Sequence, residues 1–270
     1  MQIRKPSILR IAFEIILIML TLILRAVSLS SSAGEYSNYF VMLSALAAGA
    51  VIAFNSVSRK PYLPVFKSEK SRLLKLVSYL LSLGLFVEFI NRCIASYYIF
   101  DGNSGSDVLP LVFRALGSAF ALLSSIYFIP AGLTFGGERY DVRSLRVFHI
   151  VPLLWALFRL IEVMEQAGMD SKNDVSGVLK YTMLAFALCF FFCFAGEVES
   201  QKGARGLTAV FARETVFFSA LYSADGAMLF LFKKPAVLPF EATLYFTAFT
   251  LLLFSAALVK SIISDKFTEI

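Results

Sequence analysis

The sequence predicts an all-α fold: a polytopic transmembrane helical bundle of about eight spans, forming a single integral membrane domain over residues 1–270. Hydrophobic residues make up 58% of the chain and charged residues only 16%, whereas soluble domains have about 25% charged residues. The apolar residues are gathered in segments of about 20 residues or more, long enough to cross the hydrocarbon core of a bilayer. Lys and Arg alternate between crowded and nearly empty loops, as expected of a multi-pass membrane protein.

Each expected span is an apolar stretch between polar loops, and a helix is expected there because hydrocarbon offers the backbone no other hydrogen-bond partner. The spans, in chain order, are Ile8–Leu29, Tyr39–Val57, Leu73–Phe100, Val108–Leu133, Arg146–Ala167, Gly177–Val198, Leu207–Phe232 and Pro239–Ser264. Small residues gather in the second and fourth spans, where they favour close helix packing in a membrane. No internal repeat of fixed period is visible, so an inverted-repeat transporter architecture is not predicted.

The first expected span follows a basic start and has a rival interpretation as a cleaved signal peptide. Ser31, Ser32 and Ala33 supply small residues after the apolar stretch, as a cleavage site requires. The stretch is nevertheless long and contains Glu14 and Arg25. A retained transmembrane helix is therefore preferred.

Loop charge predicts the orientation of the chain. The loop of residues 58–75 carries six Lys and Arg residues, whereas the loops of residues 30–38 and 101–107 carry none. Over all loops and both chain ends, sixteen Lys and Arg residues fall on one side and three on the other. This asymmetry places both termini in the cytoplasm, in agreement with an even number of spans. Seven spans is the alternative, if Arg213 and Glu214 lie at the interface.

Several functional classes lack the residues that they require. The net charge is +6, but the basic residues flank apolar spans, so nucleic-acid binding is not predicted. Cys93, Cys189 and Cys193 fall inside spans and are expected to be small buried side chains; with the single His149, expected near the inner interface, they supply no metal site. No phosphate-binding loop, dinucleotide glycine pattern or serine-hydrolase elbow occurs. The prediction therefore contains no catalytic residue, no cofactor and no metal, and does not favour an enzyme.

Ionisable side chains within the spans are the most informative polar residues. Each costs about 2.5–3.5 kcal/mol to insert, so such residues usually face a polar interior. In the third span, Glu88 precedes Arg92 by four residues, the favourable spacing for an ion pair on one helix. In the fifth span, Trp155, Arg159 and Glu162 lie along one stripe of the helix.

Under the inferred topology, nine charged residues lie in the outer half of the bilayer or at its outer interface, where they could line one polar pocket. They are Arg25, Glu88, Arg92, Arg114, Arg159, Glu162, Lys180, Asp225 and Glu241. Arginines suit a ligand site because a guanidinium stays charged and binds carboxylate or phosphate in a bidentate way. The predicted ligand-binding residues are Arg92, Arg114 and Arg159, the glutamates Glu88 and Glu162 that would position them, and Trp155.

A purely structural interpretation of these charges is also open. Arg25, Lys180 and Glu241 lie near helix ends, where long side chains can extend to the membrane interface. The charged pairs within the third and fifth spans can neutralise each other and join helices without any ligand.

The leading functional hypothesis is binding or transport of a small anionic or zwitterionic solute through an outward-facing pocket between the third, fourth and fifth spans. The alternative is a non-catalytic membrane scaffold or sensor component that contacts a membrane protein partner through its helices. In either case the lipid bilayer is a partner, and the expected location is a plasma membrane, with the bacterial cytoplasmic membrane preferred.

Overall fold

The computed structural model describes residues 8–30, 41–50, 71–102, 108–137, 147–167, 175–199, 204–231 and 239–264, and nearly all of them are helical. The helices are α1 (Ile8–Ser30), α3 (Arg72–Gly102), α4 (Val108–Phe135), α5 (Val151–Ala167), α6 (Val175–Val198), α7 (Ala204–Leu231) and α8 (Pro239–Ser264). Residues Val41–Ala50 form a further, short apolar helix. The described residues contain no strand. The all-α prediction is therefore confirmed.

Among the described residues, five helices are long and apolar enough to cross a membrane: α3, α4, α5 with the turn before it, α6 and α8. The described parts of α1 and α7 do not meet both criteria. Helix α7 has 28 residues, but they include Arg205, Arg213, Glu214 and Asp225, which lower its hydropathy. The bundle is thus compatible with a multi-pass membrane protein, while the number of eight spans stays a prediction.

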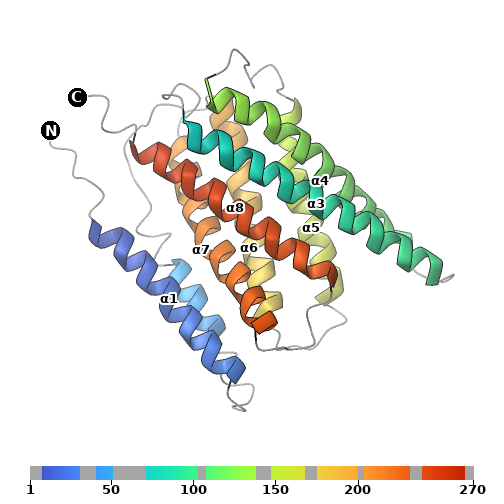
Figure 1. Cartoon of the computed structure of the whole chain (residues 1–270), viewed down its shortest axis with the longest axis horizontal. Helices are drawn as coiled ribbons and strands as arrows, with labels where there is room; N and C mark the ends of the chain where they lie inside the picture. The colour runs from blue at the N-terminus through green and yellow to red at the C-terminus, as the bar shows by residue number, and fades with distance from the viewer. Residues whose placement is uncertain are drawn as a thin grey trace.

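Six helices form a closed ring, which Figure 1 shows from one side. Helices that follow one another in sequence from α3 to α8 are packed side by side, and the contact between α3 and α8 closes the ring. Helix α1 lies outside it against α7, at the edge of the bundle. Because successive helices are antiparallel neighbours, the end of α3, the start of α4 and the end of α5 meet at one end of the ring.

Aromatic side chains from four of these helices fill the middle of the ring. Phe128 of α4 contacts Phe254 of α8 edge-on, with 5.2 Å between ring centroids, and lies 6.1 Å from Phe191 of α6. Trp155 of α5 packs edge-on against Phe191 at 6.1 Å and is fully buried. Such pairs add about 0.5–1.5 kcal/mol each beyond the burial of their area. The centre of the ring is therefore filled by packed aromatic side chains where these four helices meet.

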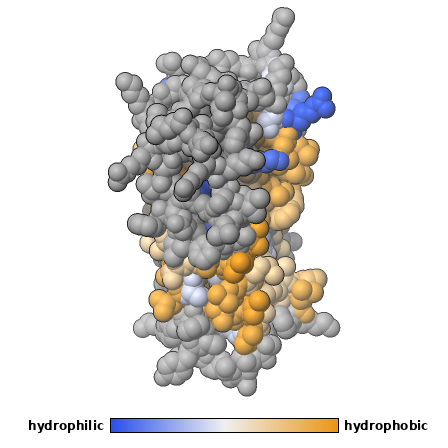
Figure 2. Space-filling view, turned by 90° about the vertical axis from the view of Figure 1, so that its left-hand side faces the viewer, coloured by the Kyte–Doolittle hydropathy of each residue, from blue (hydrophilic) through white to orange (hydrophobic). Residues whose placement is uncertain are grey.

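The outer surface is apolar over much of its described part. Viewed from the side of α1, orange apolar side chains make up most of the coloured surface (Figure 2). On α1 the exposed residues include Ile15, Ile16, Met19, Leu20 and Ile23. Contiguous apolar patches of this kind are rare on soluble monomers, and they indicate contact with the lipid bilayer.

The cysteines and the single histidine differ in how deeply they are buried. The expectation that all three cysteines are buried holds for Cys193 only: Cys189 is half-buried, and Cys93 is exposed on α3 and meets lipid if that helix spans the membrane. His149 lies in the turn immediately before α5, and its ring is buried against Tyr127, with Nδ1 3.1 Å from the phenolic oxygen.

Candidate functional site

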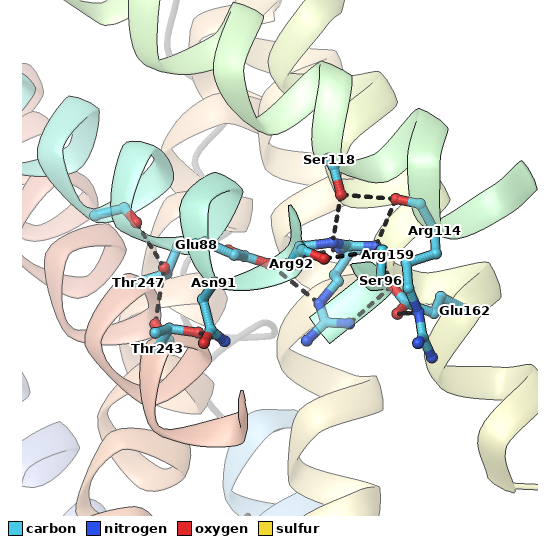
Figure 3. Close-up of polar contacts among 11 residues, drawn as sticks. Glu88, Asn91, Arg92, Ser96, Arg114, Ser118, Arg159, Glu162, Thr243 and Thr247 are labelled. Carbon is cyan, nitrogen blue, oxygen red and sulfur yellow. Dashed lines mark hydrogen bonds and ion pairs between the residues drawn. The ribbon is translucent and has the colours of Figure 1, made fainter. Parts of the chain in front are cut away.

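Five charged side chains from α3, α4 and α5 meet at one end of the ring, as the close-up in Figure 3 shows. We call them the arginine–glutamate network; its members are Glu88, Arg92, Arg114, Arg159 and Glu162. Neighbouring antiparallel helices place them at the same level although they come from three helices. The network therefore joins the helices of the predicted third, fourth and fifth spans.

Glu162 of α5 is the centre of the network, since all three arginines contact its carboxylate. Arg159 donates from Nη1 to Oε2 at 2.8 Å, and Arg114 donates from Nε to Oε1 at 3.2 Å. Arg92 donates from Nη2 to Oε2. A carboxylate that accepts several charge-assisted hydrogen bonds is strongly held in its ionised form.

Glu88 of α3 is the second carboxylate and is completely buried. Arg159 reaches it from α5, with Nε 3.1 Å from Oε1, and Arg92 lies one turn further along α3, with Nη1 at 3.7 Å. Neither oxygen of Glu88 has a hydrogen bond of good geometry. Arg92 and Arg159 thus each bridge the two carboxylates, which links α3 to α5 twice.

The backbone and small residues of α4 position Arg92. Its Nε donates to Ser118 Oγ at 3.3 Å, and its Nη2 donates to the carbonyl oxygen of Arg114 at 3.2 Å. A Cβ atom at Gly117 would lie 2.8 Å from that same Nη2, closer than real contacts allow. The small residues of this helix were expected to serve helix–helix packing; at Gly117 they make room for a guanidinium group instead.

The network contains one more positive than negative charge. Four of its side chains are at most 9% exposed, and Arg114 is 19% exposed. In the described part of the chain, Arg114 uses only Nε for its ion pair, so neither terminal nitrogen of its guanidinium has a protein acceptor. A surplus charge in so little water is unfavourable unless an anion accompanies it.

Several buried polar atoms at this end of the ring also have unused hydrogen-bonding capacity. Arg92 Nη1 and Trp155 Nε1 are buried donors without an acceptor at hydrogen-bond geometry, and both oxygens of Glu88 are buried acceptors without a donor. Buried polar groups in folded proteins are nearly always hydrogen-bonded, to protein or to a bound molecule. Among the described residues, these atoms therefore keep hydrogen-bonding capacity that the protein does not use.

The structure brings together five of the six predicted ligand-binding residues. The spacing arguments for the two pairs within helices are confirmed by the contacts of Arg92 with Glu88 and of Arg159 with Glu162. Trp155 lies one turn before Arg159 but packs into the aromatic core. Its role in binding stays a prediction. Sequence reasoning missed Ser118, because a serine in an apolar helix carries no signal of what it contacts.

A second buried ion pair lies apart from the network. Arg25 of α1 donates from Nε to Asp225 Oδ1 of α7 at 2.6 Å. Ser176 of α6 donates to Asp225 Oδ2 at 2.6 Å and accepts from Arg25 at 3.2 Å. The expectation that Arg25 extends to the interface is wrong, since the residue is only 6% exposed. No ion pair or hydrogen bond joins this pair to the network among the described residues, so one pocket lined by all nine outer charges stays a prediction. The side chain of Glu241 lies outside the described residues.

Comparisons with protein-family models, with curated proteins and with solved structures find no match to the chain.

Proposed function

We propose that this protein is a multi-pass plasma-membrane protein that binds a small anionic or zwitterionic solute at the arginine–glutamate network. The observation that supports this proposal most strongly is the surplus positive charge of the network, carried by buried guanidinium groups. A bound monoanion neutralises that surplus. Transport of the solute is the extension of the proposal, and the bacterial cytoplasmic membrane is the preferred location.

The proposed topology keeps eight spans with both termini in the cytoplasm. Helix α7 packs between α6 and α8, two helices apolar enough to cross a membrane, so its polar residues need not face lipid. Under this topology the network lies in the outer half of the bilayer. The distribution of Lys and Arg among the loops supports that orientation.

Arg114 is the residue best placed to contact the solute. It is the most exposed member of the network and the one whose terminal nitrogens have no protein acceptor among the described residues. A planar guanidinium with both terminal nitrogens available matches the two oxygens of a carboxylate or phosphate. For a zwitterion, Glu88 offers carboxylate oxygens with spare capacity to the ammonium group.

The experiment is a thermal-stability screen of the purified protein against small carboxylates, inorganic phosphate and amino acids, at constant ionic strength. A ligand that binds only the folded state raises the melting temperature as its concentration increases. In Arg114→Gln the shift is expected to be lost. The matched control is Arg213→Gln, which removes a cation that pairs with Glu14 outside the network and should leave the shift unchanged.

The proposal fails if no solute stabilises the wild type, or if Arg114→Gln and Arg213→Gln retain the same shift. One observation favours the scaffold alternative as a second candidate: four of the five network residues are almost completely enclosed and paired with one another. A scaffold requires no solute and predicts a stable complex with a membrane protein partner. Co-purification of such a partner in stoichiometric amount would support it.

A further inference from the structure

A buried carboxyl group lies outside both ion-pair clusters, on α7. Glu214 is 0% exposed, and neither of its carboxyl oxygens has a hydrogen-bond partner in the described part of the structure. Its neighbour in sequence, Arg213, pairs instead with Glu14 of α1, 3.8 Å away. The positive charge next to Glu214 in the sequence is therefore shared with another carboxylate.

Small and aromatic residues surround this carboxyl group. Gly49, in the helical residues Val41–Ala50, faces it closely: a Cβ atom there would lie 3.4 Å from Glu214 Oε2 and 2.8 Å from the ring of Phe218. Phe218 in turn stacks on Phe186 of α6, with ring centroids 5.0 Å apart. In the predicted second span, Gly49 thus packs directly against the acidic side chain of Glu214 and the ring of Phe218.

The other charged and titratable groups nearby do not supply a counter-ion. Helix α1, which packs against α7, contributes the acidic Glu14, the partner of Arg213. The helical residues Val41–Ala50 contain no titratable side chain, and α6 carries Lys180, Tyr181, Cys189, Cys193 and the buried Glu197, none of which forms an ion pair or hydrogen bond with Glu214. In α8 no residue between Tyr245 and Lys260 is titratable.

A fully buried carboxylate in apolar surroundings, with neither a hydrogen-bond donor nor a counter-ion, is strongly disfavoured relative to the protonated acid. We infer that Glu214 is a proton-binding site within the helical bundle, occupied by one exchangeable proton. The proposed route for exchange passes Glu14 on the adjoining helix α1, whose side chain is 23% exposed. The inference is independent of solute binding at the arginine–glutamate network, although a transporter with both sites could couple solute to protons.

The test is reaction of the purified wild-type protein with dicyclohexylcarbodiimide, an apolar reagent that modifies protonated carboxyl groups, followed by mass-spectrometric mapping of the modified residue. Modification of Glu214 is expected at acidic pH and should fall at least tenfold at alkaline pH. Glu214→Asp should retain the reaction and Glu214→Gln should lose it. Glu199→Gln, which removes an exposed carboxyl group outside this site, is the matched control and should leave Glu214 reactive.

Three outcomes would overturn the inference. The first is no modification of Glu214 at any pH while other carboxyl groups react. The second is modification that does not change with pH, since the proton would then not be exchangeable. The third is suppression by sodium ions at constant pH, which would identify a cation site instead. The mapping uses the wild type, so the test stands even if a Glu214 variant fails to fold.

Discussion

Replacing Glu162 by glutamine should destabilise the protein more than any other single loss of a negative charge in the described residues. The side chain keeps its size but loses the charge that all three network arginines contact. The surplus of the network rises from one positive charge to two, in a site where four side chains are at most 9% exposed. Removing one partner of a buried ion pair costs about 3–5 kcal/mol, and we expect a loss in that range.

The assay is equilibrium unfolding in mixed micelles of mild detergent and dodecyl sulfate, followed by circular dichroism. The control is Glu14→Gln, because Glu14 is partly exposed and makes one ion pair of 3.8 Å; its loss should be about 0–1 kcal/mol. Adding Arg114→Gln to Glu162→Gln removes the extra positive charge and should recover at least about 1 kcal/mol. If Glu162→Gln costs no more than Glu14→Gln, the contacts of the network do not stabilise the fold.

Three further variants test other parts of the structure. Gly117→Val should displace the guanidinium of Arg92 and destabilise the protein by about 1–3 kcal/mol. Its control is Ala119→Val, at an exposed position of the same helix, which should change the free energy of unfolding by less than about 0.5 kcal/mol. Equal effects of the two substitutions would contradict the packing of Arg92 against Gly117. Asp225→Asn should leave the arginine of α1 buried without its counter-ion and cost about 3 kcal/mol in the same unfolding assay, and a neutral result would show that this ion pair does not hold α1. In a background without native cysteines, Val65→Cys should react with an impermeant maleimide only after the membrane is permeabilised, and reaction in intact cells would invert the topology.

Much of the fold can be predicted from the sequence because long apolar segments between polar loops have few alternatives in a membrane. The pairs Glu88–Arg92 and Arg159–Glu162 are also predictable, since one helical turn brings residues three or four apart together. The convergence of α3, α4 and α5 at one end follows from short loops between antiparallel helices. These arguments use only neighbours in the chain.

The remaining features depend on contacts between residues distant in sequence. The contact of Arg25 with Asp225 joins residues 200 positions apart, and both were assigned to a single outer pocket because topology gives depth but not position around the bundle. Likewise, the ion pair between Glu88 and Arg159 joins α3 to α5, two helices that each pack against α4. Hydropathy alone does not fix the number of spans, because charged residues lower the hydropathy of α7. Helix α7 packs between α6 and α8, and a helix enclosed in this way can carry charges that a lipid-facing helix cannot.

Trp155 offers the most direct measurement of solute binding at the network, because it is the single tryptophan of the chain and lies one turn before Arg159. Its fluorescence is followed while small carboxylates or phosphate are added to the purified protein at constant ionic strength. We expect a saturable change in the wild type and in Arg213→Gln, and none in Arg114→Gln. A change of the same size and midpoint in Arg114→Gln, or no saturable change with any of these anions in the wild type, would contradict the proposed site.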